Sequence, residues 1–194
     1  MATNQDAAFG LRPIGKVGQN RDAQGLSEYT IAANTTAAIY QNDPVSAYAA
    51  GAIQVAAAGD ALIGSLNGVF YTDSTTKKPT WANHLTAANA ATDIVGFVSD
   101  DPYERFEIQV NSTFATAAVF SLADIEYTAG NSANNVSKVE LDRASLSLNS
   151  GQLKVIGITK DDENDNLTSA GVLASNANVV VTINEHFLKA TTGI

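Results

Sequence analysis

The fold class is decided by residues 105–110, which read Arg105-Phe106-Glu107-Ile108-Gln109-Val110. Polar and apolar side chains alternate along this stretch without a break. Successive side chains of a β-strand point to opposite faces, so a period of two is typical of a strand with one buried face. We therefore predict a strand whose apolar side chains, Phe106, Ile108 and Val110, face a core while the polar ones face outward.

Strand-like segments recur on both sides of this stretch, separated by short turns. Asn67-Gly68 is the strongest two-residue hairpin signal in the chain, and it divides residues 61–71 into two predicted short strands. Residues 178–184 are the most strongly β segment. The other predicted strands are residues 26–31, 35–40, 52–55, 94–98, 146–148 and 153–159.

Helix signals are weak. Residues 115–124 are the best candidate, with Ala118, Val119 and Leu122 at helical spacing. Many short strands and so little helix predict a mainly β fold, a sandwich or barrel-like domain with at most one or two short helices. We expect this β-rich domain to span residues 26–194, with a polar loop or insertion at residues 73–93.

Residues 1–25 lack any sustained period and are predicted to form an extended N-terminal arm. Glycines give this stretch conformational freedom, and Pro13 biases the residue before it toward an extended conformation. A purely solvated tail has no use for spaced apolar residues, so we interpret the arm as a partner-binding segment. The expected contact residues are Phe9, Leu11, Ile14 and Val17, with Arg12 and Lys16 adding charge pairing. Deleting residues 2–20 is then expected to remove partner binding and to leave the β domain folded.

The composition is acidic and rich in small side chains. The 194 residues include 20 Asp and Glu against 11 Lys and Arg, a formal net charge of −9. Such a field repels phosphate backbones and anionic lipid, so neither a nucleic acid nor a membrane is an expected partner. Much of the apolar content is alanine, which buries little area per residue. We therefore expect a homo-oligomer, with a homotrimer as the expected form.

Several classes of protein are excluded or disfavoured by what the sequence lacks. Cysteine is absent, which excludes disulfides, thiolate metal sites and thiol catalysis. No window approaches 18 consecutive apolar residues, and residues 1–6 lack the basic and apolar regions of a signal peptide. We expect a soluble protein that is made in a cytoplasm.

Catalytic patterns are also missing. His84 and His186 have no partner residues at metal-ligand spacing. The sequence has no Gly-x-Ser-x-Gly elbow, no Gly-x-Gly-x-x-Gly and no P-loop. We therefore expect no catalytic residues, no cofactor and no enzyme activity.

An acidic run at residues 161–166 imitates the beginning of a calcium loop. Asp161, Glu163 and Asp165 occupy positions 1, 3 and 5 of such a loop. The pattern fails at position 6, where Asn166 replaces glycine, and at position 12, where Val172 cannot supply a carboxylate. We interpret the run as a solvated turn, a weak metal candidate, and expect calcium to be dispensable.

Trp81 is the only tryptophan, and it lies in the polar stretch 73–93. Tryptophan is enriched at interface hot spots, so this residue is a candidate interface anchor. Burial beneath a loop fits the sequence equally well. Both interpretations stay open at this point.

Two segments together resemble structural proteins encoded among the head genes of tailed bacteriophages, especially marine and cyanobacterial phages. The first is residues 6–14, Asp6-Ala7-Ala8-Phe9-Gly10-Leu11-Arg12-Pro13-Ile14. The second is residues 96–110, in which Gly96-Phe97-Val98-Ser99-Asp100-Asp101-Pro102-Tyr103-Glu104 leads into the alternating stretch. The group they resemble is that of the head decoration, or cement, proteins.

This resemblance implies a β-rich capsid decoration protein whose partner is the major capsid protein. Such proteins commonly form trimers over local three-fold positions of the shell, often with an extended arm on the capsid protein. By this resemblance the chain is expected on the outer capsid surface of the virion, after synthesis in the host cytoplasm. Its role would be mechanical, because it would add interface area across neighbouring capsid subunits.

Three other functions are open to the sequence. The chain is also compatible with another phage structural subunit, such as a tail-tube, connector or fibre-associated protein. A carbohydrate-binding β-sandwich is a second alternative, with Trp81, Tyr71 and Tyr103 stacking on sugar rings. A hydrolase with an unrecognised site is the third.

Overall fold

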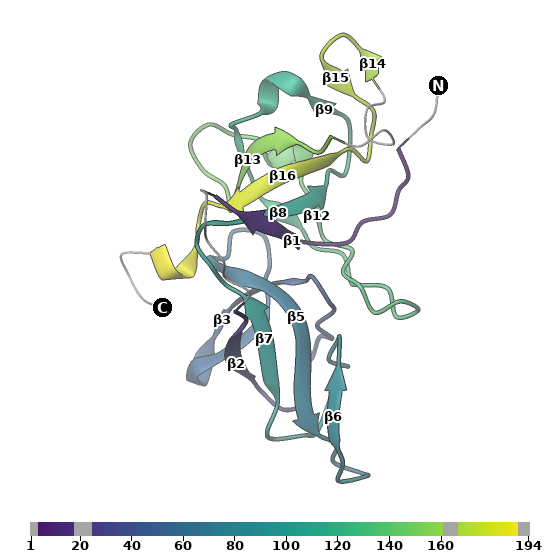
Figure 1. Cartoon of the computed structure of the whole chain (residues 1–194), viewed down its shortest axis with the longest axis vertical. Coiled ribbons are helices and arrows are strands. Elements are labelled where there is room, and N and C mark those ends of the chain that lie inside the picture. The colour runs from purple at the N-terminus through teal and green to yellow at the C-terminus, as the bar shows by residue number, and fades with distance from the viewer. Residues whose placement is uncertain (1–3, 18–24, 161–166, 190–194) are drawn as a thin grey trace.

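Two β-sheet units are stacked along the long axis of the molecule, as Figure 1 shows. The computed structural model describes residues 4–17, 25–160 and 167–189. The lower unit, here called the barrel unit, comprises residues 27–99, and the upper one, the sheet unit, comprises residues 104–186 together with residues 12–16. The mainly β fold with a barrel-like sheet confirms the predicted fold class.

The barrel unit is built from five strands that close on themselves. They are β2 (Ser27–Ile31), β3 (Pro44–Tyr48), β4 (Ala52–Val55), β5 (Leu62–Thr72) and β7 (Val95–Ser99). Their order is β3-β4-β2-β7-β5, and β5 pairs with β3 to complete the ring. All pairings are antiparallel except β2 with β4. The buried cluster of this unit is Ile31, Ile39, Val45, Ile53, Ile63, Leu66, Val69, Leu85, Ala91, Ile94 and Val98.

The hairpin predicted at Asn67-Gly68 is wrong, because β5 runs through both residues. Leu66 pairs with Val98 and Gly68 pairs with Phe97, so Asn67 is an extra residue at a β-bulge. Neither Asn67 nor Gly68 has the positive φ that a two-residue turn with Asn-Gly requires. The bulge shifts the alternation by one residue, which lets both Leu66 and Val69 enter the barrel interior.

The stretch 73–93 consists mostly of turns and loops, but it also contributes a strand and a buried residue to the barrel unit. Its strand β6 (Pro79–Ala82) pairs with the second half of β5. Beyond it, Leu85 is fully buried and exchanges backbone hydrogen bonds of 2.9 and 2.7 Å with Ile39.

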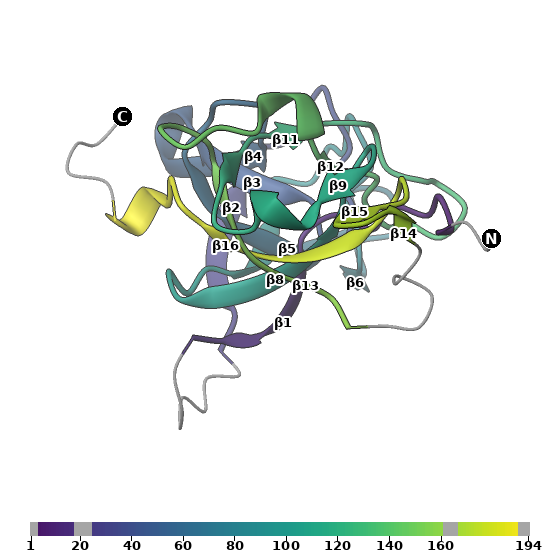
Figure 2. The ribbon, with the colours of Figure 1, turned by 90° about the horizontal axis from the view of Figure 1, so that it is seen from above.

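The sheet unit contains a five-stranded antiparallel sheet in the order β1-β8-β16-β13-β10. Its strands are β1 (Arg12–Lys16), β8 (Glu104–Gln109), β10 (Leu122–Ala123), β13 (Leu153–Ile158) and β16 (Asn178–Ile183). Smaller sheets pair β11 (Ile125–Glu126) with β12 (Glu140–Leu141), and place β15 (Val172–Leu173) between β9 (Phe114–Ala115) and β14 (Leu167–Ser169). Figure 2 shows β8, β13 and β16 side by side from above.

The apolar side chains of the alternating stretch 105–110 are buried, as predicted. Phe106, Ile108 and Val110 are fully buried in the core of the sheet unit. Glu107 and Gln109, which were predicted to face outward, are also buried. The reason is that the N-terminal segment covers them, as described below.

The helix predicted at residues 115–124 is wrong. This stretch contains β9, the three-residue 3-10 helix η2 (Thr116–Ala118) and β10. Leu122 and Ala123 pair with β13, and this sheet pairing outweighs a weak helix propensity. The other helical segments in the described residues are also three-residue 3-10 turns, η1 (Ala49–Gly51), η3 (Arg143–Ser145) and η4 (Phe187–Lys189).

Hydrogen bonds join the two units, and so do Ala56 and Leu62, two apolar residues of the barrel unit that belong to the buried cluster of the sheet unit. The side-chain amide of Gln152 in the sheet unit donates to the carbonyl oxygens of Ala57 and Asp60, at 2.9 and 2.7 Å. The backbone N–H of Leu62 donates to the carbonyl of Glu185 at 2.9 Å, and the Leu62 side chain belongs to the core of the sheet unit. We call this junction the seam. Within the described residues, no helix is long and apolar enough to cross a membrane.

Candidate interaction surfaces

The N-terminal segment, residues 4–17, lies on the rest of the chain, which corrects the prediction of a separate arm. Leu11 is fully buried in the core of the sheet unit. Its N–H donates to the Asn42 carbonyl at 2.9 Å, and its carbonyl accepts from the Ser65 hydroxyl at 2.6 Å. Gly10 has a φ of 75°, and a Cβ there would lie 2.3 Å from the Asn42 carbonyl oxygen. This close fit is internal, so Leu11 cannot serve as a partner contact.

The two basic residues predicted to contact a partner form ion pairs within the chain. Arg12 pairs with the buried carboxylate of Glu107 and also lies over the Phe9 ring, 4.4 Å from its centroid. Lys16 pairs with Asp101, and its side chain is almost buried. Lys16 is therefore used internally, whereas Arg12 keeps half of its side chain exposed.

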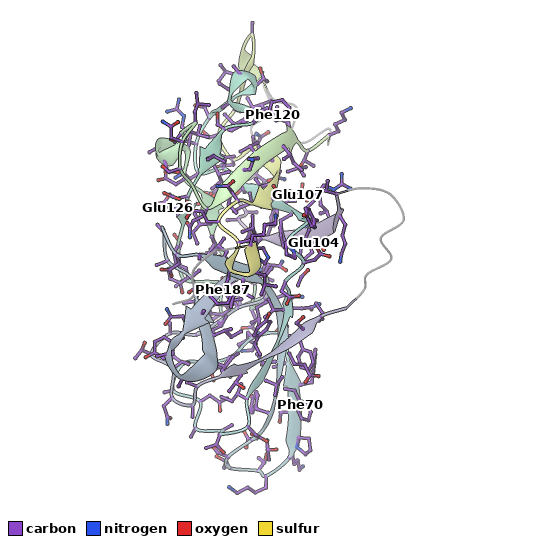
Figure 3. All side chains as sticks on the ribbon, turned by 90° about the vertical axis from the view of Figure 1, so that its left-hand side faces the viewer. Phe70, Glu104, Glu107, Phe120, Glu126 and Phe187 are labelled. Carbon is purple, nitrogen blue, oxygen red and sulfur yellow. The ribbon has the colours of Figure 1, made fainter. Side chains whose placement is uncertain are left out.

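The N-terminal segment covers polar side chains of β8, and this explains why only the apolar half of the alternation in residues 105–110 was predicted correctly. The Gln109 side chain accepts from the Ala7 N–H at 3.0 Å and donates to the Gln5 carbonyl at 2.9 Å. Figure 3 shows Glu104 and Glu107 beside β1. Burial raises the pKa of Glu104, and the positive charge of Lys16 opposes that shift. The N-terminal segment thus completes the outer face of β8.

Ile14 and Val17 remain on the surface, where their side chains are 46% and 47% exposed. The register of β1 against β8 shifts between Pro13 and Gly15, so Ile14 is the extra residue of a bulge. The Val17 N–H donates to the Tyr103 carbonyl at 2.8 Å, and the Tyr103 ring is about half exposed. We call Ile14, Val17 and Tyr103 the β1 surface.

Trp81 is 57% exposed, which excludes the buried alternative. Its ring lies 4.7 Å from the Phe97 ring at an interplanar angle of 48°. It also covers Gly68, where a Cβ would lie 3.0 Å from a Trp81 ring carbon. Phe70 pairs with Trp81 across β5 and β6 and is exposed as well. These contacts hold the indole in a fixed orientation, and we call Phe70, Trp81 and Phe97 the Trp81 surface.

The three aromatic residues named for sugar stacking do not share one platform. Trp81 lies on the outer wall of the barrel unit, whereas Tyr71 packs against the buried cluster inside it. Tyr103 lies beside β1, and the Lys189 ammonium is 4.7 Å from its ring centroid. The structure therefore does not bring Trp81, Tyr71 and Tyr103 together into one site.

The weak metal candidate of the sequence lies in a part of the chain that the structure does not describe. Asp161, Glu163 and Asp165 lie outside the described residues. Among the described ones, no group of three His, Asp or Glu side chains is arranged to hold a metal ion.

Both histidines are engaged in packing. The His84 ring stacks on Tyr40, with centroids 6.1 Å apart and an interplanar angle of 9°. His186 is buried at the seam, where its Nδ1 accepts from the Leu188 N–H at 3.1 Å, and burial lowers its pKa.

Asp43, the residue before β3, is a buried carboxyl where the two units meet, because its side chain is hydrogen-bonded to Ser137 of the sheet unit. Its side chain accepts from the Tyr40 N–H at 2.7 Å. Burial raises the pKa of Asp43 to about 6, against the opposing effect of Ser137 and the Tyr40 N–H. The group therefore changes charge within the range of ordinary buffers.

A third apolar surface, which the sequence did not indicate, lies on the sheet unit. Phe120 is 75% exposed and Leu148 is 82% exposed, the highest values among the large apolar residues described.

Comparison of the chain with protein-family models, curated proteins and solved structures finds no match. The three surfaces are therefore the features from which a function can be argued.

Proposed function

We propose that this chain is a virion structural protein that decorates the capsid of a tailed phage by binding across neighbouring major capsid protein subunits. The observation that carries the proposal is that the two segments with the phage resemblance are neighbours in the fold. Residues 12–14 of the first segment lie in β1, and residues 104–109 of the second form β8. Arg12 pairs with Glu107 and Pro13 with Phe106. Parts of both segments thus lie in two paired strands, whereas residues 96–99 of the second segment belong to β7 in the barrel unit.

The separation of the exposed apolar surfaces supports a bridging role. A protein that joins two neighbours needs at least two contact surfaces facing different directions. Figure 3 shows Phe70, of the Trp81 surface, at the opposite end of the molecule from Phe120. The β1 surface lies between them on the sheet unit. Clusters of exposed aromatic and aliphatic residues are typical of protein interaction sites.

The physical basis of reinforcement is the burial of apolar area on two capsid subunits at once. Each fully buried large apolar side chain contributes about 1.5–3 kcal/mol. Separating the subunits under the pressure of packaged DNA would expose these side chains again, so the bound protein opposes separation. The net charge of −9 disfavours contact with the DNA itself, which fits a place on the outer capsid surface.

Co-sedimentation with expanded shells of the major capsid protein tests this proposal. We expect saturable binding of the wild-type protein, and binding at least about tenfold weaker for Ile14→Asp/Val17→Asp, because charge would enter the apolar contact of the β1 surface. Ser74→Asp, at an exposed turn of the barrel unit, is the control and should bind like wild type.

Two results would contradict the proposal in different ways. If wild-type protein stays in the supernatant at saturating concentration, the decoration role is wrong. If the double variant binds with wild-type affinity while keeping its circular dichroism spectrum, the contact lies on a different surface from β1.

A further inference from the structure

The last element in the described part of the chain is held at its beginning by an imidazole ring. The 3-10 turn η4 follows His186 directly, and the Leu188 N–H donates to the Nδ1 atom of His186 at 3.1 Å. The first N–H groups of a helical turn have no partner inside it, so the side chain that precedes the turn is the usual acceptor for one of them. The Lys189 N–H donates to the His186 carbonyl at 2.9 Å, which closes the turn. His186 is only 2% exposed, so the ring that caps η4 is itself fixed within the seam.

The turn η4 contributes to two surfaces of the molecule. Phe187 packs against the buried cluster of the barrel unit and forms one wall of an apolar pocket of about 670 Å³, beside Ile53 and Ile63. Figure 3 shows Phe187 near the junction of the two units. At the other end of the turn, the Lys189 ammonium lies over the Tyr103 ring of the β1 surface. The position of this one turn therefore shapes the pocket and covers part of the β1 surface.

We propose that His186 is a proton-sensitive cap, whose neutral ring holds η4 in place and whose protonation at Nδ1 releases the turn from both surfaces. A neutral imidazole has one ring nitrogen that can accept a hydrogen bond, whereas an imidazolium has none. In the folded protein that acceptor is Nδ1. When Nδ1 takes up a proton from solvent, its new N–H faces the N–H of Leu188, so two donors meet and the cap is lost.

The groups around the ring determine where in the pH range this happens. The titratable groups at or next to it are Lys189 of η4, Asp100 and Asp101 between β7 and β8, Tyr29 of β2, Lys16 of β1 and the preceding residue Glu185. Burial lowers the pKa of His186 below its usual value of 6.5, and the positive charge of Lys189 lowers it as well. Asp100 and Asp101 oppose this shift. Both carboxylates are engaged elsewhere, Asp100 with the Tyr29 hydroxyl and Asp101 with Lys16.

The sign of the pH dependence follows from the lowered pKa. The folded state binds the proton more weakly than the unfolded chain, so the neutral cap contributes its full stabilisation above pH 6.5. This stabilisation is lost as the pH falls through the folded-state pKa. The turn is therefore held at neutral pH and released in acid. The inference needs only the chain itself and does not depend on the decoration role.

NMR relaxation of the backbone amides at pH 7.5 and pH 4.5 tests the cap. In wild-type protein we expect residues 187–189 to have order parameters of about 0.85 at pH 7.5, and values below about 0.6 at pH 4.5. His186→Asn is the matched variant, because asparagine caps a helical turn with an oxygen that does not titrate, so its turn should stay rigid at both pH values. His186→Ala lacks the acceptor and should be mobile at both. His84→Asn, which removes the other histidine, should respond to pH as wild type does.

The wild-type protein decides the test even without a variant, because the midpoint of the release should coincide with the midpoint of the shifts of the His186 ring resonances. The inference is overturned if residues 187–189 stay rigid in wild type at pH 4.5, whether or not the ring takes up a proton. It is also overturned if His186→Asn becomes mobile at the same pH as wild type, since a group other than the imidazole would then control the turn.

Discussion

A protein that lacks residues 2–17 is expected to lose cooperative folding of its sheet unit. The deletion removes Leu11 from the core, β1 from the edge of the sheet, and the cations that pair with Glu107 and Asp101. Loss of one buried leucine side chain costs about 2–5 kcal/mol, and an unpaired buried carboxylate adds to that cost. Because typical domains have only about 5–15 kcal/mol of stability, these losses together are enough to unfold the unit.

The single substitution Leu11→Ala also tests whether the N-terminal segment stabilises the sheet unit, with a smaller expected effect than the deletion. We expect the free energy of unfolding to fall by about 2–5 kcal/mol, measured by urea denaturation followed by circular dichroism. Val17→Ala, at an exposed position of the same segment, is the matched control and should stay within about 0.5 kcal/mol of wild type. A truncated protein with the wild-type spectrum and melting curve would restore the original interpretation of a separate arm.

Asp43→Asn is expected to remove a large pH dependence of stability. The pKa of Asp43 is about 6 in the folded protein and 3.8 as the reference value for the unfolded chain. The folded state therefore binds more protons between these values, so the stability contributed by this group falls as pH rises from about 4 to above 6. The shift of about two pKa units corresponds to about 3 kcal/mol.

Asparagine stays neutral and keeps an oxygen that accepts from the Tyr40 N–H. The variant should therefore match wild type at pH 4 and exceed its unfolding free energy by up to about 3 kcal/mol at pH 7.5. Asp73→Asn provides a control of opposite sign, because hydrogen bonds from Thr76 lower the pKa of that exposed carboxyl. Identical pH profiles for Asp43→Asn and wild type would show that the Asp43 carboxylate is solvated or paired in solution.

The sequence predicts which residues of the sheet are buried when the alternation within a single strand determines their burial. Phe106, Ile108 and Val110 alternate and are buried as expected. The burial of Glu107 and Gln109 could not be predicted, because it depends on a segment about a hundred residues away that supplies Arg12 and the backbone of residues 5–7. Long-range pairing of polar groups leaves no periodic signal in either segment.

Two other errors have local causes. Asn67-Gly68 has the composition of a tight turn, but a bulge uses the same residue types to shift the alternation within one strand. In residues 115–124 the alanines have high helix propensity, yet Leu122 and Ala123 gain more from pairing with β13.

The interaction surfaces show a comparable limit of sequence reasoning. Apolar residues spaced along the N-terminal segment predicted contacts, and the structure places Leu11 in the chain's own core but Ile14 and Val17 on its surface. Spacing cannot distinguish an internal partner from an external one. No pattern in the sequence indicated that Phe120 is exposed or that its backbone has a left-handed conformation.

The central claim, that the chain reinforces a capsid, is tested most directly by the thermal disruption of expanded phage shells with and without saturating protein. Shell breakdown can be followed by light scattering while DNA release is followed by a dye. We predict that bound protein raises the disruption temperature by several degrees, and that the Ile14→Asp/Val17→Asp variant at the same concentration gives a smaller increase. A disruption temperature that is unchanged when wild-type protein saturates the shells would contradict the claim.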